Sequence, residues 1–227
     1  IPISKGELVS SVDAVPTFLG ERILKVQTLA GGRKKSGGVK VGSNDDAINF
    51  AKEFLGNNFL GEEISEILID EKFDIDKELY IGISFDTSKR CPVLIFSEEG
   101  GIDIESSENV TKVYIDYVEG LNTDFLSNVE LPAVLKNELI QIVMKLWECF
   151  VKFDCRMIEI NPLVVSNKGL VAVDGVVVLD DDAKYRREIS FPERTSCRKA
   201  TSREIAARKI DADDYRGVAG KTFVDLD

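Results

Sequence analysis

Short runs that alternate apolar and polar residues make up most of the chain and predict antiparallel strands. These runs cover residues 22–29, 64–70, 79–86, 91–97 and 110–117. Residues 43–55 and 131–152 instead carry apolar side chains at three-to-four spacing, which predicts two amphipathic helices. A third helix is expected from Thr201 to about Ile210, because Thr201-Ser202-Arg203-Glu204 has the pattern of a capping box.

The segment 157–178 is the clearest hairpin in the pattern. Two apolar, β-branched runs flank the turn Ser166-Asn167-Lys168-Gly169. If the two central turn residues form the loop, the numbers of facing residues sum to 335, and Asn161 lies opposite Asp174 with Cβ atoms about 5 Å apart. Glu159 lies two residues before Asn161 and therefore on the same face. One face of an apolar hairpin thus gathers two carboxylates and an amide, while Pro162 indicates an edge or a bulge.

This polar set permits two interpretations. The three side chains could be solvated residues on the outer face of a half-exposed hairpin. A cluster of carboxylate and amide oxygens also suits Mg²⁺, which takes one or two carboxylates together with water and nucleotide phosphate. The acidic run Asp180-Asp181-Asp182 raises the same choice between a solvated turn and a metal site.

A loop rich in glycine and in positive charge follows the strand 22–29. Four glycines and three cations fall within the eight residues from Gly31 to Gly38. Such a mobile loop can bring backbone N–H groups and positive charge against phosphate, although an ordinary exposed basic loop has the same composition. It is neither a GxxxxGK[ST] loop nor a GxGxxG fingerprint.

Composition narrows the possible functions. The chain has 227 residues, 44% of them hydrophobic, and a formal net charge of -11, which disfavours non-specific binding to nucleic acid or anionic membranes. It has no histidine, so a Ser-His triad or a histidine metal site cannot be built from it. Its four cysteines show no zinc or disulfide spacing and fit a cytoplasmic protein. The start without Met and the strand-like pattern that stops at Asp227 predict a segment of a longer protein.

Five motifs, in order, resemble the β subunit of succinyl-CoA synthetase (succinate–CoA ligase). They are Lys25-Val-Gln27, Ala30-Gly-Gly-Arg33, Lys77-Glu-Leu-Tyr-Ile-Gly82, Glu99-Gly-Gly-Ile-Asp-Ile-Glu105 and Glu159-Ile-Asn-Pro-Leu163. The resemblance covers nearly the whole chain. It implies an α+β fold of the ATP-grasp type, in which two α/β subdomains with antiparallel sheets clamp a nucleotide. The subdomains would be residues 1–75 and 76–227, preceded by a helix and followed by a CoA-ligase domain that both lie outside this sequence.

The resemblance also implies phosphate contacts. Lys25 matches a lysine that contacts nucleotide phosphate, and Gly31, Gly32 and Arg33 match the glycine-rich loop over it. The loop departs from the usual Gly-Arg-Gly-Lys order, because Lys34 follows Arg33 directly.

The remaining matched positions are acids and one amide. Glu78 matches an acid near the nucleotide ribose, and Asp70 falls where the family has a longer acid near the adenine. Asn161 and Asp174 match Mg²⁺ ligands. Glu159 matches a carboxylate that works with a phosphohistidine loop from the α subunit.

The function implied is ATP- or GTP-dependent formation of succinyl-CoA from succinate and CoA, a step of the tricarboxylic acid cycle. The phosphohistidine would belong to the α subunit, so this chain alone would bind nucleotide without turning over. The compartment implied is the cytoplasm, or the mitochondrial matrix in a eukaryote.

Other interpretations stay open from the residues. Malate–CoA ligase and ATP-citrate lyase share the Glu159 hairpin motif. ADP-forming acetyl-CoA synthetase needs a second histidine that this chain lacks. From other classes, the chain could be a non-catalytic nucleotide-binding or subunit-docking module, or a plain structural α/β domain.

Overall fold

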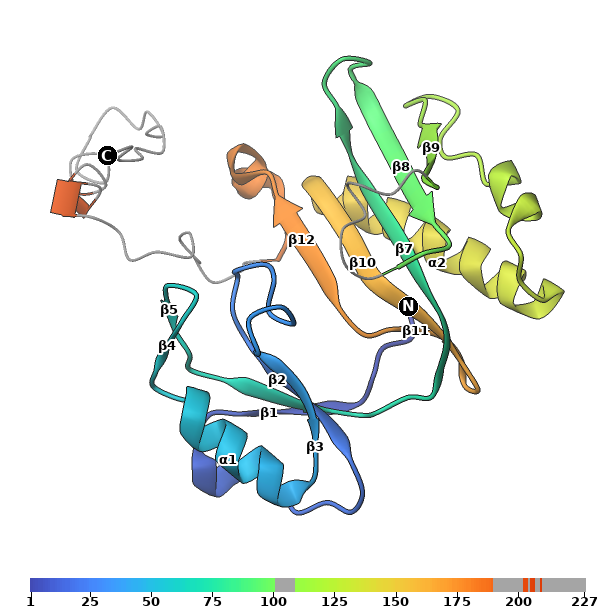
Figure 1. Cartoon of the computed structure of the whole chain (residues 1–227). Helices are drawn as coiled ribbons and strands as arrows, with labels where there is room; N and C mark the ends of the chain where they lie inside the picture. The colour runs from blue at the N-terminus through green and yellow to red at the C-terminus, as the bar shows by residue number, and fades with distance from the viewer. Residues whose placement is uncertain (101–108, 190–201, 204, 207–208, 210–227) are drawn as a thin grey trace. The chain divides into compact units, whose positions relative to one another are not determined.

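Antiparallel strands form two larger sheets and one two-stranded sheet in the computed structural model, which describes residues 1–100 and 109–189 together with positions 202, 203, 205, 206 and 209 (Figure 1). The chain divides into two compact units, one of Ile1–Lys5 with Phe73–Ser190 and one built on Gly6–Lys72. The subdomain boundary predicted at residue 75 stays a prediction.

The smaller unit is a four-stranded sheet with one helix against it. Its strands lie in the order β1-β6-β2-β3. Their bounds are β1 Gly6–Val9, β6 Ile67–Asp70, β2 Arg22–Val26 and β3 Val39–Gly42, and a two-stranded hairpin, β4 Asn58–Phe59 with β5 Glu62–Glu63, adjoins them. The helix is α1, Asn44–Phe54, and a short 3-10 helix, η1, covers Val12–Ala14.

Helix α1 buries one face against this sheet. Ala47, Phe50 and Ala51 are its buried residues, and they share a core with Leu24 and Val26 of β2. Full burial of one such phenylalanine side chain contributes roughly 1.5–3 kcal/mol. Ser43 is the N-cap of this helix, and its hydroxyl accepts a hydrogen bond from the Asp46 N–H. Because Leu24 and Val26 of β2 face this core, the alternation of the strand places the residues beside them on the other face of the sheet.

The larger unit is a six-stranded antiparallel sheet with helix α2 on one face. The strands run β11-β10-β7-β8-β9, and β12 pairs with the same edge of β10 as β11. The bounds are β7 Ile75–Asp86, β8 Cys91–Ser97, β9 Thr111–Tyr114, β10 Cys155–Ser166, β11 Gly169–Ala172 and β12 Gly175–Leu179. The helices are α2 Ala133–Lys152 and the 3-10 helices η3 Asp124–Asn128 and η4 Asp181–Arg186.

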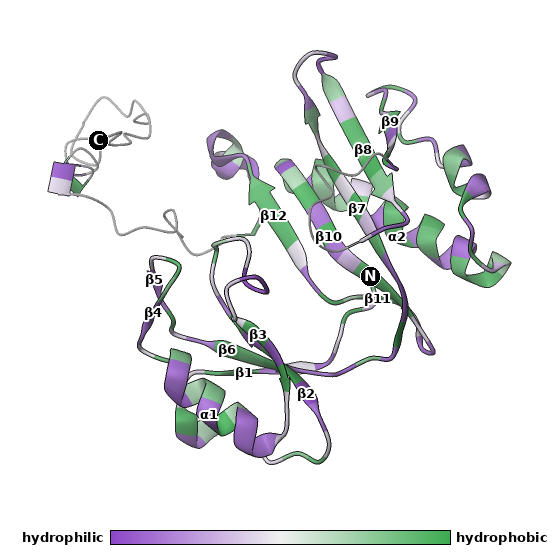
Figure 2. Cartoon of the chain, viewed as in Figure 1, coloured by the Kyte–Doolittle hydropathy of each residue, from purple (hydrophilic) through white to green (hydrophobic). Residues whose placement is uncertain are grey.

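The core of the larger unit lies between α2 and the sheet. Leu79, Ile81 and Ile83 of β7 are completely buried there, and Leu139 and Val143 of α2 pack in the same cluster. In Figure 2 the strands are mostly hydrophobic in colour, whereas both helices carry the mixed colours of amphipathic segments. Because odd-numbered residues of β7 face the core, its even-numbered residues occupy the opposite face.

The elements differ from the predicted ones in a few places. Strand β3 was not predicted, and β7 begins at Ile75, four residues before the predicted start of this strand at residue 79. The first residues join the larger unit, where Pro2 accepts a hydrogen bond from the N–H of Ala172 at 2.9 Å. No helix among the described residues is long and apolar enough to cross a membrane.

Some predictions fall outside the described residues. Residues 101–105 of the Glu99–Glu105 motif and the strand pattern before Asp227 are among them. Of the helix predicted from Thr201 to Ile210, the described positions 202, 203, 205, 206 and 209 are helical, and the rest lies outside.

Candidate functional site

The hairpin that carries the predicted metal ligands has the predicted register. Ser166 pairs with Gly169 at the turn, and each residue pair between β10 and β11 keeps the sum of 335. The register extends to the candidate residues, because the Asn161 N–H donates to the carbonyl of Asp174 at 3.2 Å. Glu159 pairs with Val176 in the same register. The sequence prediction that Asn161 and Asp174 face each other is therefore confirmed.

The strand is irregular where Asn161 lies. The pairing of β10 with β7 shifts between Ile160 and Leu163, which are both buried in the core. Two residues, Asn161 and Pro162, lie between them, where a regular strand would have one. The Asn161–Pro162 peptide bond is cis. The bulge expected at Pro162 is confirmed, and it places Asn161 at a local break in the ladder.

Glu159 belongs to a polar face formed by β7 and β10. It pairs directly with Gly82 across the two strands. The Tyr80 hydroxyl donates to Glu159 Oε2 at 2.9 Å. Glu78 lies two residues before Tyr80 on the same face of β7, and it is half-buried. The candidate ribose acid, the candidate catalytic acid and a buried tyrosine thus share one face of the sheet.

The oxygen donors of the hairpin fit a small, hard cation. Asn161 and Asp174 supply one amide and one carboxylate, both half-buried, and the Gly175 N–H donates to Asp174 Oδ1 at 3.0 Å. Mg²⁺ is bound in proteins by one or two carboxylates and keeps water and phosphate oxygens as further ligands. Within residues 1–100 and 109–189, no three His, Cys, Asp or Glu side chains are grouped to hold a metal. The donor set therefore fits Mg²⁺ bound together with phosphate.

Lys25 and Asp70 form an ion pair within the smaller unit. Lys25 Nζ lies 2.7 Å from Asp70 Oδ2, and the side chains are 11% and 1% exposed. Ile23 pairs with Asp70 and Lys25 with Leu68, so the two charged side chains are diagonal neighbours on one face of β2 and β6. The candidate adenine acid and the candidate phosphate lysine are therefore in direct contact.

The glycine-rich loop is closed at its base by backbone hydrogen bonds. The Gly38 N–H donates to the carbonyl of Arg33 at 2.8 Å, and the Val26 N–H donates to the carbonyl of Gly38 at 2.9 Å. The Arg33 guanidinium also donates to the carbonyl of Val26 at 3.3 Å. Gly31 and Gly32 lie in open space, and Gly32 has a φ of +77° that favours glycine. These two candidate glycines are exposed, as are residues 34–37 of the same loop.

Glu62 is a residue that sequence reasoning missed. Its Oε2 accepts hydrogen bonds from the Thr28 hydroxyl at 2.7 Å and from the Leu29 N–H at 3.1 Å. Glu62 lies on β5, whose two-residue length gives no periodic signal. It ties the segment before the glycine-rich loop to the β4–β5 hairpin.

Tyr80 was also missed, although it lies inside one of the recognised motifs. Its hydroxyl contacts Glu159, which is 79 positions later in the chain. Alternation along β7 places Tyr80 on the polar face, but the pairing of β7 with β10 is a long-range contact that the local pattern does not contain.

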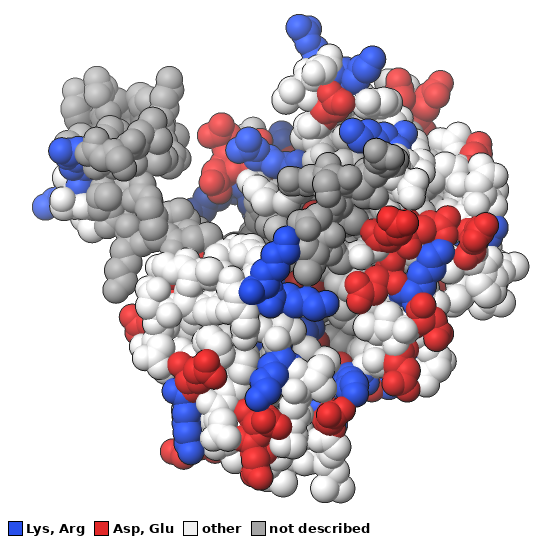
Figure 3. All heavy atoms as spheres, in the orientation of Figure 1, with Lys and Arg blue, Asp and Glu red and all other residues white. Residues whose placement is uncertain are grey.

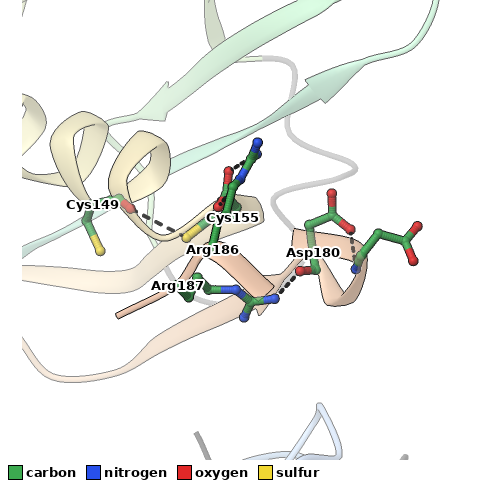
Figure 4. A network of polar contacts seen from close by, with 7 residues as sticks. Cys149, Cys155, Asp180, Arg186 and Arg187 are labelled. Atoms are coloured by element: carbon green, nitrogen blue, oxygen red, sulfur yellow. Dashed lines mark hydrogen bonds and ion pairs between the residues drawn. The ribbon is translucent and has the colours of Figure 1, made fainter. Parts of the chain in front are cut away.

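The acidic run after β12 has structural contacts (Figure 4). The Asp180 carboxylate caps η4 by accepting from the Asp182 N–H at 3.1 Å, and Arg187 donates to the Asp180 carbonyl. Arg186 forms an ion pair with Asp154, and this hydrogen-bonded guanidinium holds the pKa of Asp154 below its usual value. The contacts of Asp180 therefore fit a helix cap.

Cys149 and Cys155 border this network. The Cys155 thiol lies 3.7 Å from the carbonyl of Cys149, and burial raises its pKa to about 11 (Figure 4). A thiol with a raised pKa is a poor nucleophile at neutral pH. Cys155 is buried in the core of the larger unit, and Cys149 packs against that core.

Acidic side chains gather at the right of the molecule in Figure 3. Glu98, Glu99 and Glu130 of the larger unit line a cavity of about 530 Å³, and Lys77 forms an ion pair with Glu98. Acidic side chains repel a phosphate ligand, so such a ligand needs cations or a metal at its own site.

Comparison with known proteins places the chain in a family. Residues 1–165 match the family described as an ATP-grasp domain. This chain belongs to the ATP-grasp family. The predicted ATP-grasp fold is thereby confirmed.

The curated relatives of this ATP-grasp chain agree with the predicted resemblance. It is 36% identical over 199 residues to the protein named succinate–CoA ligase [ADP-forming] subunit beta of Methanocaldococcus jannaschii, which covers 82% of this chain and 55% of the relative. The protein of the same name from Bacillus cereus (strain B4264) is 36% identical over 207 residues, covering 83% and 53%. The chain thus spans about half the length of these relatives.

A solved structure shares the ATP-grasp fold. The structure titled ATP citrate lyase from Methanothrix soehngenii in complex with citrate and coenzyme A is 25% identical, with a TM-score of 0.66, and the match covers 91% of this chain and 53% of that one. The predicted resemblance to the succinate–CoA ligase β subunit is confirmed, while the roles of the individual site residues stay predictions.

Proposed function

We propose that this ATP-grasp chain is the nucleotide-binding part of an acid–CoA ligase β subunit. The complete enzyme would form succinyl-CoA from succinate and CoA with ATP or GTP, through a histidine phosphorylated on a partner α subunit. The observation that carries the proposal is the pairing of Asn161 with Asp174, with Glu159 on the same hairpin, in a chain similar to succinate–CoA ligase β subunits.

The smaller unit would supply positive charge to the nucleotide phosphates. Lys25 is held by a buried carboxylate, so its ammonium has one fixed position instead of a mobile one. Arg33 and the N–H groups of Gly31 and Gly32 would add donors from the loop. Phosphoryl transfer requires little covalent chemistry from the protein and depends on such positioning and charge stabilisation.

The hairpin of the larger unit would hold the metal. Asn161 and Asp174 are the residues that would ligate Mg²⁺. When bound, the ion neutralises charge on the phosphate oxygens. Glu78, on the neighbouring strand β7, would accept a hydrogen bond from the nucleotide ribose. Asp70 would stay paired with Lys25, and its position matches that of an acid near the adenine in the family.

Glu159 would serve the acceptor. A neutral imidazole attacks the γ-phosphorus through the lone pair of one nitrogen, a P–N bond forms, and the bond from phosphorus to the nucleoside diphosphate oxygen breaks. The ring then carries positive charge, and a carboxylate that accepts a hydrogen bond from its other N–H stabilises that charge. This chain has no histidine, so the acceptor would come from the partner.

Titration of nucleotide into the isolated chain tests the proposal. Mg·ATP and Mg·GTP are titrated into the wild type, Lys25→Ala and Asp174→Asn, and binding is measured by calorimetry. We expect the wild type to bind and each variant to bind at least about tenfold more weakly. Lys25→Ala loses a cation that would contact phosphate, and Asp174→Asn loses a carboxylate that would ligate Mg²⁺. Asp181→Asn removes an exposed carboxylate of η4 and is the matched control, expected to bind as the wild type does.

Binding by none of these proteins would overturn the proposal in favour of a subunit-docking module.

The similarity to the ATP citrate lyase structure leaves citrate as an alternative acid substrate. The complete enzyme assayed with succinate, malate and citrate separates these ligases. The compartment we propose, the cytoplasm or the mitochondrial matrix, rests on the cysteine usage of the sequence.

A further inference from the structure

A buried tyrosine hydroxyl contacts the carboxylate proposed to serve the phosphoryl acceptor. Tyr80 is 8% exposed, and its hydroxyl donates to Glu159 Oε2 at 2.9 Å. The two residues come from adjacent strands, β7 and β10, which lie inside the sheet and not at its edge. A hydrogen bond from a buried donor to a carboxylate is stronger than one between neutral groups.

Gly82 makes this contact possible. It pairs directly with Glu159, and a Cβ built at Gly82 would lie 2.7 Å from the Tyr80 hydroxyl oxygen and 3.3 Å from the Cβ of Glu159. The phenol therefore occupies the space above the glycine and reaches the neighbouring strand across it. Any side chain at position 82 would displace the tyrosine hydroxyl or the carboxylate.

The surroundings hold Tyr80 in one position. Its two neighbours on β7, Leu79 and Ile81, are completely buried on the other face of the sheet and fix the strand. Ser97, 1% exposed, pairs with Tyr80 from β8 on the other side. The tyrosine is therefore a rigid donor that orients a less buried carboxylate.

We infer that Tyr80 is a positioning residue that fixes the side chain of Glu159 through this hydrogen bond and leaves its Oε1 to accept from the partner's imidazole. The inference rests on the proposed function of Glu159. Since a hydrogen bond to one carboxylate oxygen restricts rotation about the side-chain bonds, the acceptor meets an oxygen in a defined place. Loss of such an outer contact typically costs 10- to 100-fold in activity.

The test is a double-mutant cycle in the complete enzyme that contains this chain. Tyr80→Phe, Glu159→Gln and the double variant are compared with the wild type. Transfer of the labelled γ-phosphoryl group to the partner's histidine is measured in a single turnover by rapid quench, and nucleotide affinity is measured separately. Tyr114→Phe is the matched control, because Tyr114 is an exposed tyrosine of the same sheet, on β9.

The expected pattern separates positioning from a structural role. Tyr80→Phe lowers the transfer rate about tenfold or more without changing nucleotide affinity. The double variant is no slower than Glu159→Gln, because Tyr80 acts only through Glu159. Gly82→Ala keeps the hydroxyl but displaces it, and it slows transfer as Tyr80→Phe does. Tyr114→Phe transfers at the wild-type rate.

Two results overturn the inference while leaving the proposed function intact. One is a Tyr80→Phe enzyme that transfers at the wild-type rate. The other is a double variant slower than Glu159→Gln by the same factor that Tyr80→Phe shows alone, which would mean that Tyr80 acts independently. A wild-type enzyme that binds nucleotide but labels no histidine would instead overturn the proposed function, and the role of Tyr80 with it.

Discussion

Among single residues, Asp70 and Lys25 form the most buried charged contact described in the smaller unit. The aspartate side chain is 1% exposed and the lysine 11%, so neither charge has much access to water. Removing one partner of such a pair leaves the other charge buried and uncompensated. The pair is therefore important to the stability of this unit as well as to the position of the proposed phosphate lysine.

We predict that Asp70→Asn lowers the free energy of unfolding of the smaller unit by about 3 kcal/mol. The reason is that asparagine cannot balance the ammonium charge of Lys25. Urea unfolding followed through the amide NMR signals of β2 and β6 measures this change.

A surface ion pair in the same unit provides the control. Lys72 and Glu21 are 41% and 57% exposed, with Nζ 2.6 Å from the carboxylate oxygen. Glu21→Gln is expected to cost less than about 1 kcal/mol, because exposed ion pairs contribute little. Equal losses in Asp70→Asn and Glu21→Gln would show that burial of the first pair is energetically unimportant.

Neither the Lys25–Asp70 pair nor the Tyr80–Glu159 contact could be predicted from the sequence. Both join residues on neighbouring strands that are 45 and 79 positions apart in the chain. Alternation shows which face each residue occupies, but the choice of neighbouring strand depends on the tertiary fold. The recognised motifs contain Lys25, Tyr80 and Glu159 but not Asp70. The resemblance gave a role to all of these residues except Tyr80, and it gave no contact between any two of them.

At the scale of elements, helix α1 depends on a reciprocal cap. The Ser43 N–H and hydroxyl both donate to Asp46 Oδ2, at 3.0 and 2.8 Å, and Lys40 Nζ contacts Oδ1 at 3.0 Å. The hydrogen bonds from Ser43, followed by the charge of Lys40, lower the pKa of Asp46 from 3.8 to about 2. The cap thus prefers the ionised carboxylate.

This lowered pKa predicts how the cap responds to acid. A carboxylate whose folded pKa is depressed contributes stability that is fully present above its unfolded pKa and is lost as pH falls through the folded one. The contribution of Asp46 should therefore be lost between about pH 4 and about pH 2. Ser43→Ala should move the pKa of Asp46 back toward 3.8, as carbon-13 NMR titration of the carboxyl group can measure.

Ser65→Ala, at an exposed serine of the same unit, should leave the titration of Asp46 unchanged. A wild-type midpoint near 3.8 would contradict the capping account.

Elements whose signal is local were predictable, and elements that depend on distant partners were not. The 157–178 hairpin was predicted with its register because a four-residue turn fixes the pairing, and Gly169, with a φ of +93°, supplies the conformation that turn requires. Strand β3 has only four residues and pairs with β2 across the whole glycine-rich loop. Its sequence alone gives too short a pattern to separate a strand from a loop.

For the molecule as a whole, the chain contains two compact units and about half the length of its curated relatives. Each unit carries one group of the proposed site residues, on β2, β6 and the glycine-rich loop in one unit and on β7, β10 and the hairpin in the other. The acceptor histidine is absent from the sequence. We therefore expect the isolated chain to bind nucleotide without turning it over.

A divalent cation bound with nucleotide is proposed to lie at Asn161 and Asp174. Mn²⁺ is a paramagnetic substitute for Mg²⁺, so the site can be located by adding Mn²⁺ and ATP to the nitrogen-15-labelled chain and mapping which backbone amide signals broaden. We expect broadening centred on residues 159–162 and 173–176, lost in Asp174→Asn and kept in Asp181→Asn. Broadening centred on residues 180–182 with the hairpin signals unchanged would contradict it.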